Sequence, residues 1–77
     1  MHYSLLDSVV LNRDIAEHGL KLGDLGVIVE IYEPDGLEVE FVMASGRTGA
    51  LVTLSLGDVR HVSDGDLVRV RQFVHSM

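Results

Sequence analysis

The residues of this chain best suited to acid–base chemistry are two carboxylates, Glu30 and Glu40, which lie in neighbouring predicted strands. The turn between these strands is expected to set the two glutamates opposite each other on one face of a hairpin. Like charges at close range raise the pKa of one member, as in general acid–base pairs. Two solvated glutamates on an outer sheet face are the more common arrangement, and this is the interpretation we adopt.

The sequence lacks the usual patterns for nucleophilic, metal-assisted or phosphate chemistry. It has no cysteine, which removes thiolate nucleophiles, disulfides and sulfur-based zinc sites. Ser45, Ser55 and Ser63 lie in predicted turns without a G-x-S-x-G context, and no phosphate-binding glycine loop occurs. We therefore expect no catalytic residue, no metal site and no cofactor. The histidines show no i, i+4 or H-x-H spacing, and we expect them at the surface: His2, His18, His61 and His75.

The charge of the chain is negative and unevenly distributed. Twelve acidic and six basic residues among 77 give a net charge of −6. Residues 1–46 hold nine acidic and two basic residues, for −7, whereas residues 47–77 hold three and four, for +1. Nucleic-acid binding depends on clustered lysine and arginine, so this balance argues against DNA or RNA as the main partner and suits a basic protein surface.

Turn signals at short intervals divide the chain into short β-branched runs. Without sustained apolar spacing at 3.6 residues, this rhythm is typical of an all-β barrel or sandwich. Apolar runs are far shorter than the ~20 residues of a membrane span, so we expect a soluble, cytoplasmic protein. A long structured excursion is expected over Asn12 to Leu25, and a tight turn, 3₁₀ in character, over Ser55 to Asp58. Strands are expected at Ser8 to Leu11, Val27 to Glu33, Thr48 to Leu54 and Val59 to Val62, with a third strand after Gly36.

Two hairpins fix the expected register. Glu33-Pro34-Asp35-Gly36 is predicted to be a three-residue loop with Gly36 at positive φ, and Ser45-Gly46 a two-residue loop. Alternation along the strand from Val27 to Glu33 is expected to turn Val27, Val29 and Ile31 toward the core and Ile28, Glu30 and Tyr32 outward. The expected pairs are Glu33 with Leu37, Tyr32 with Glu38, Ile31 with Val39, Glu30 with Glu40, Val29 with Phe41, Ala50 with Phe41, Val52 with Val39, Leu54 with Leu37 and Ala44 with Arg47.

Several blocks of the sequence occur in the order seen in one family. The run from Glu17 to Tyr32, EHGLKLGDLGVIVEIY, is followed by Val39-Glu40-Phe41, Gly46-Arg47-Thr48 and Leu54. This series resembles the domain of unknown function family 4926, over about Leu5 to Val62. The resemblance implies a bacterial protein with an all-β fold, a small SH3-like barrel of five strands, and no assigned activity. The Gly23 to Val27 segment is also similar to half of a KOW motif.

Residues 64–77 extend past this resemblance. Val68 and Val70 alternate with Arg69 and Arg71, which is strand-like at period two. We divide the chain into an SH3-like barrel at 1–63 and a C-terminal tail at 64–77, which forms either an extra strand or a dimerisation edge. A homodimer is expected, because a five-stranded barrel completes its core without the tail.

The charge distribution leads to two hypotheses for function. In the first, the chain is a non-enzymatic interaction module whose acidic sheet face docks on a basic protein, as an antitoxin or immunity-type neutraliser would. The second is a KOW-like RNA- or ribosome-associated accessory domain that uses Lys21, Arg47 and Arg60. The partner-binding residues expected for the first hypothesis, including two from the Arg13 to Asp24 loop, are Lys21, Asp24, Glu30, Tyr32, Glu38 and Glu40.

Overall fold

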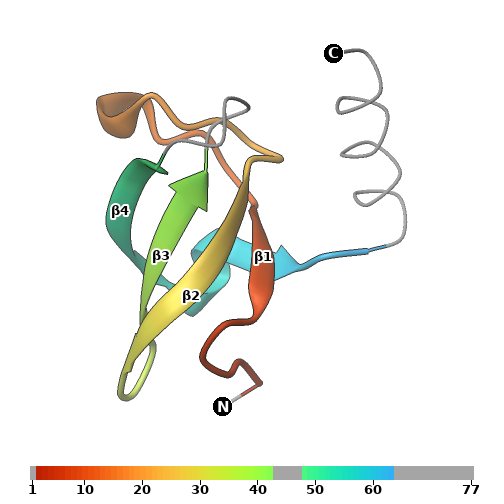
Figure 1. Ribbon diagram of the computed structural model, residues 1–77, viewed down its shortest axis with the longest axis vertical. Coiled ribbons are helices and arrows are strands. Elements are labelled where there is room, and N and C mark those ends of the chain that lie inside the picture. Colours follow the sequence, from red (N-terminus) through yellow and green to blue (C-terminus); the bar gives the residue numbers. More distant parts are fainter. Residues whose placement is uncertain (1, 43–47, 64–77) are drawn as a thin grey trace.

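Over the residues that the structure describes, the chain is all-β and forms one antiparallel sheet of five strands in the order β4-β3-β2-β1-β5 (Figure 1). The structure is a computed structural model, and it describes residues 2–42 and 48–63. Because β5 lies at a steep angle to β2, β3 and β4, the sheet is strongly curled, as in a small barrel. The strands are β1 Ser8–Leu11, β2 Leu25–Tyr32, β3 Gly36–Val42, β4 Thr48–Ser55 and β5 Val59–His61, and the 3₁₀ turns are η1 Ala16–His18 and η2 Leu56–Asp58.

A compact apolar core occupies the concave side of the sheet. Phe41 is the largest fully enclosed side chain, and Leu37 and Val39 flank it on the same face of β3. Alternation along β3 buries these three residues and turns Glu38 and Glu40 outward. The remaining buried apolar residues are Val9, Val10, Leu11, Ile15, Leu20, Ile28, Val52, Leu54 and Val59.

The pairing of β3 with β4 confirms the register expected from the sequence. Phe41 pairs with Ala50, Val39 with Val52, and Leu37 with Leu54. Leu37, Val39 and Phe41 alternate with glutamates on β3, and Val52 and Leu54 lie two apart on β4, so this register brings the buried side chains of both strands to one face. The Ser45-Gly46 loop and the pairing of Ala44 with Arg47 lie outside the described residues.

The register predicted between β2 and β3 was wrong, by two residues next to the hairpin turn and by three residues beyond the irregularity between Ile28 and Glu30. Ile31 pairs with Leu37 rather than Val39, and Gly26 rather than Val29 pairs with Phe41. The hairpin loop begins one residue earlier than expected, so that Tyr32 pairs with Gly36. Gly36 is not at positive φ. Glycine at this position instead lets the backbone of β3 lie close to Tyr32, since a Cβ on Gly36 would lie 3.1 Å from Cβ of Tyr32.

An irregularity between Ile28 and Glu30 also reverses the predicted facing of the middle of β2. Ile28 is fully buried, whereas Val29 is exposed, contrary to the expected inward Val29. The bulge lets Ile28 face the core opposite Val39 while Glu30 still faces outward opposite Glu38. Ile28 is therefore part of the core, although the sequence pattern predicted that it faces solvent.

The segment between β1 and β2 is an ordered loop, as expected. Ile15 and Leu20 are buried and pair across it through two backbone hydrogen bonds of 2.8 and 3.1 Å. η1 lies between them and ends at Gly19, which adopts φ 68°. Two apolar anchors thus hold the loop on the end of the sheet. The tail at 64–77 lies outside the described residues, and the division into barrel and tail stays a prediction.

Candidate functional site

The outer face of β2, β3 and β4 carries a group of carboxylates, which we call the acidic face: Glu30, Glu38 and Glu40. Glu38 and Glu40 are half-buried, one on each side of buried Val39, and Glu30 is exposed. Glu38 lies beside Thr53 and Glu40 beside Leu51, as expected. These three strands contain no lysine or arginine, so they bring no cation of their own to the face.

Two of these glutamates are direct cross-strand neighbours, but the pair is not the one predicted. Glu30 pairs with Glu38, whereas Glu40 pairs with Val27. Like charges directly opposite each other in a sheet are destabilising by some tenths of a kcal/mol up to about 1 kcal/mol. In the described part of the chain, the hydrogen bond to Glu30 comes from the neighbouring backbone N–H of Ile31, at 3.3 Å. Among residues 2–42 and 48–63, no ion pair offsets the charge repulsion of this glutamate pair.

Tyr32 extends the acidic face toward the hairpin turn. Its hydroxyl donates a 2.8 Å hydrogen bond to Oε1 of Glu38, so the predicted side-chain contact forms although the backbone partner of Tyr32 is Gly36. This hydrogen bond, with partial burial and the charges of Glu38 and Glu30, raises the pKa of the Tyr32 hydroxyl. The phenol therefore stays protonated and acts as a donor, which holds the Glu38 carboxylate in place.

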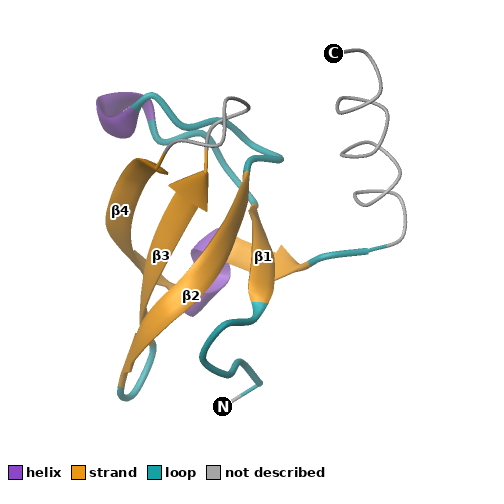
Figure 2. Cartoon of the chain, viewed as in Figure 1, coloured by secondary structure: helices purple, strands orange, loops and turns teal. Residues whose placement is uncertain are grey.

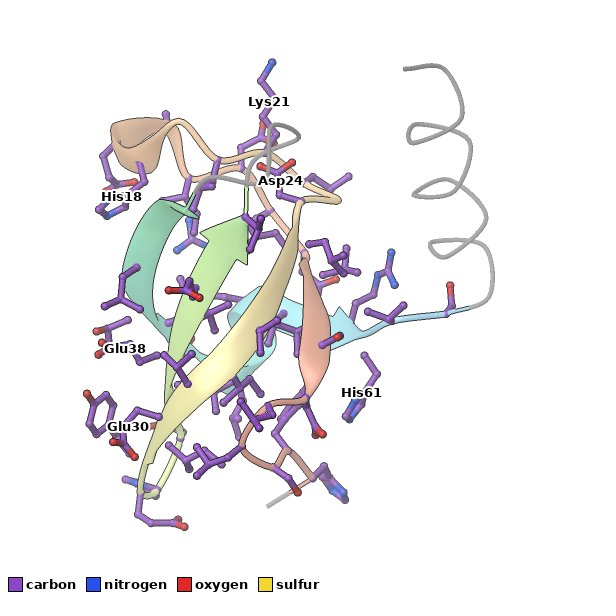
Figure 3. The ribbon with its side chains drawn as sticks, viewed as in Figure 1. His18, Lys21, Asp24, Glu30, Glu38 and His61 are labelled. Carbon is purple, nitrogen blue, oxygen red and sulfur yellow. The ribbon has the colours of Figure 1, made fainter. Side chains whose placement is uncertain are left out.

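Lys21 and Asp24, the other two predicted site residues, lie away from the acidic face. Figure 3 shows them with His18 at one end of the molecule, and Glu30 toward the other. The Asp24 carboxylate accepts the backbone N–H of Lys21 at 2.9 Å, and the backbone N–H of Asp24 donates to the carbonyl of Lys21 at 2.9 Å. The role visible for Asp24 is to close this turn before β2, and the structure does not join these two residues to the glutamates.

An ion pair that sequence reasoning missed fastens the Asn12 to Asp24 loop to the β4–β5 turn. Nε of Arg13 lies 2.8 Å from Oδ1 of Asp58, and Asp58 also accepts hydrogen bonds from the backbone and hydroxyl of Ser55. The hydrogen bond from Arg13 is the main cause that lowers the pKa of Asp58 below its usual value, and the hydrogen bonds from Ser55 lower it further. The Ser55-x-x-Asp58 spacing is a capping-box signal that the sequence does display, but nothing local indicates Arg13 as its partner.

The cations invoked for the RNA-binding alternative do not form one described cluster. Lys21 is in the β1–β2 loop, and Arg60 is on β5, with its Nη1 donating to the carbonyl of His61 at 3.2 Å. Arg47 lies outside the described residues. His61 stacks on Tyr3 with ring centroids 4.4 Å apart, and Figure 3 shows His61 on the side of the view away from Glu30 and Glu38.

The end of the sheet near η1 is hollowed, and the residues that line the hollow include Phe41 and Leu25, which are apolar, and His18 and Asp24, which can titrate. Its volume of about 240 Å³ is below the ~300–1,000 Å³ of typical small-molecule sites. Across residues 2–42 and 48–63, no three His, Cys, Asp or Glu residues are grouped as metal ligands would be. Among the described residues, the hollow therefore shows no set of metal ligands, and the titratable side chains that line it are His18 and Asp24.

In a comparison with protein families, residues 5–61 match the model of the Domain of unknown function (DUF4926) family. The chain belongs to the DUF4926 family. This confirms the family resemblance drawn from the Glu17 to Tyr32 run, and the five-stranded all-β fold agrees with the barrel that the resemblance implied. No curated protein and no solved structure gives a significant match. In the described part of this DUF4926 chain, no helix is long and apolar enough to cross a membrane.

Proposed function

We propose that this DUF4926 protein is a non-enzymatic interaction module whose acidic face docks on a basic protein. The observation that carries the proposal is the direct pairing of Glu30 with Glu38 on a face built from strands without lysine or arginine. A cationic partner relieves this repulsion when it binds, so its binding free energy is more favourable at this face than at an isolated carboxylate. Charge attraction also raises the rate of association. A cytoplasmic neutraliser of a basic enzyme, of antitoxin or immunity type, is one concrete form.

Exposed apolar surface next to the carboxylates supports docking of a protein rather than of a free cation. Leu51 is 56% exposed beside Glu40, and Tyr32 is 45% exposed beside Glu38. Protein interfaces combine such aromatic and aliphatic contacts with charged groups at their rim. A partner surface carrying lysine or arginine around an apolar centre therefore fits this face.

Retention on two charged matrices tests the proposal against the RNA-binding alternative. We expect the protein to bind immobilised poly-lysine at low salt and to pass through immobilised RNA or heparin. Replacing both Glu38 and Glu40 by glutamine should lower the salt concentration needed for elution from poly-lysine. The matched control is the double variant Glu17→Gln and Glu33→Gln, which removes the same charge from η1 and from the hairpin turn.

The control variant shows whether the acidic face or the net charge of the protein causes retention on poly-lysine. The proposal requires the control variant to elute close to wild type. Equal loss of retention in both double variants would show that total charge alone drives binding, and strong retention on RNA would favour the KOW-like alternative.

A further inference from the structure

Within the part of the chain that the structure describes, β4 is an edge strand of the sheet, and its sequence lacks the usual features that block strand pairing. It is the last strand in the sheet order and, within the described residues, pairs only with β3 (Figure 2). Alternate backbone groups of an edge strand point away from its neighbour and stay available for hydrogen bonds. Natural edges are blocked by lysine, proline or inward charges, but the eight residues of β4, TGALVTLS, contain no charge and no proline.

The acidic face lies directly beside this edge. On β3, Glu38 and Glu40 are the outward neighbours of Thr53 and Leu51 of β4. A strand added next to β4 would lie about 4.8 Å from it and about 10 Å from β3. An extended lysine or arginine side chain spans most of that distance, and the carboxylate side chains supply the rest.

Leu51 is a second reason to expect a long cationic side chain on the strand that is added beside β4. Its side chain is 56% exposed and lies between the open edge and Glu40. The aliphatic stem of a lysine or arginine can cover Leu51 while its charged head reaches the carboxylate. On the other face of β4, Val52 and Leu54 are buried, so the intervening residues of an added strand would extend the apolar core.

We propose that β4 takes an extended basic segment of the partner protein as an added strand, with lysine or arginine at every second position over the acidic face. The inference rests on the proposed function and specifies how the partner is recognised: backbone hydrogen bonds supply affinity, and the alternating cations supply specificity. The segment has small apolar residues between its cations. The chain's own sequence carries this alternation at Arg69 and Arg71, which makes a second copy the competing occupant.

Peptides that alternate arginine and valine test the proposal on the full-length protein. The probe is a seven-residue peptide, studied by calorimetry and by hydrogen exchange of the β4 amides. Two control peptides carry backbone N-methyl groups. In one control every arginine is methylated, and in the other every valine is methylated. Because the N–H groups of alternate residues point to opposite edges of a strand, each control loses hydrogen-bond donors along one edge only. We expect one methylated peptide to bind like the parent and the other about tenfold more weakly, because each lost hydrogen bond is worth a factor of a few. The parent peptide should also slow exchange in β4.

Three results would overturn the proposal. If both methylated peptides bind as tightly as the parent while Glu38→Gln with Glu40→Gln weakens binding, the acidic face binds cations without strand addition. The proposed function then stands and the edge inference fails. If neither methylation nor the glutamine variants change binding, both fail. If the full chain sediments as a dimer whose β4 amides are already protected before peptide is added, the edge is occupied by a second copy.

Discussion

A single methyl group added at Gly26 tests the observed register between β2 and β3. Gly26 pairs with Phe41, and a Cβ at Gly26 would lie 2.6 Å from Cγ1 of Val39 and 2.9 Å from the Phe41 ring. Both neighbours are almost fully buried, so neither can move into solvent. Overpacking of this kind costs about 1–3 kcal/mol, offset by about 0.4–1 kcal/mol from the stiffer unfolded chain. The net loss expected is about 1–2 kcal/mol.

Thermal unfolding followed by circular dichroism measures this effect. In a domain of this size, about 1 kcal/mol corresponds to a shift of roughly 4–8 °C in Tm. The matched control is Gly57→Ala, because a Cβ at Gly57 meets nothing within 4 Å and its φ is not in the left-handed region. We expect Gly57→Ala to melt at or slightly above the wild-type temperature. If Gly26→Ala melts as high as this control, Gly26 does not lie against Phe41 and the register is refuted.

Two further predictions concern charges. Glu30→Gln should raise the free energy of unfolding by some tenths of a kcal/mol because it removes the repulsion with Glu38, whereas Glu40→Gln, opposite an apolar residue, should leave it unchanged in denaturant titrations. Equal effects of the two variants would contradict the observed pairing. The lowered pKa of Asp58 means that its ion pair with Arg13 stabilises the fold above about pH 4 and that this contribution is lost as the pH falls through the lowered pKa. The difference in the free energy of unfolding between wild type and Arg13→Ala should therefore shrink as the pH is lowered. If this difference stays constant down to about pH 2, the ion pair does not titrate in this way.

Strand positions and one hairpin register were predictable because the sequence specifies them locally. β3 places Leu37, Val39 and Phe41 two apart with glutamates between them, so its facing follows from period two. On β4, Val52 and Leu54 lie two apart with Thr53 between them, and the tight turn predicted over Ser55 to Asp58 corresponds to η2. In these segments, the local pattern and the tertiary packing favour the same arrangement.

The β2 register was not predictable, because its sequence, LGVIVEIY, is apolar on both faces. Such a strand does not define one register by hydrophobic pattern alone, and a bulge reverses its facing without any change in composition. The Glu30–Glu38 pair depends on that bulge, so its correct partner required the structure. The Arg13–Asp58 pair joins residues 45 apart, beyond the reach of local patterns.

The central claim, that the acidic face is the docking surface, is tested most directly by mapping amide chemical shifts during titration with a lysine-rich peptide. We expect the largest shifts in β2, β3 and β4, around Glu30, Glu38 and Glu40. We also expect a higher salt concentration to reduce these shifts together, since charge attraction drives encounter. Shifts concentrated instead in the turn from Lys21 to Asp24 or in β5, with the acidic face unaffected, would contradict it.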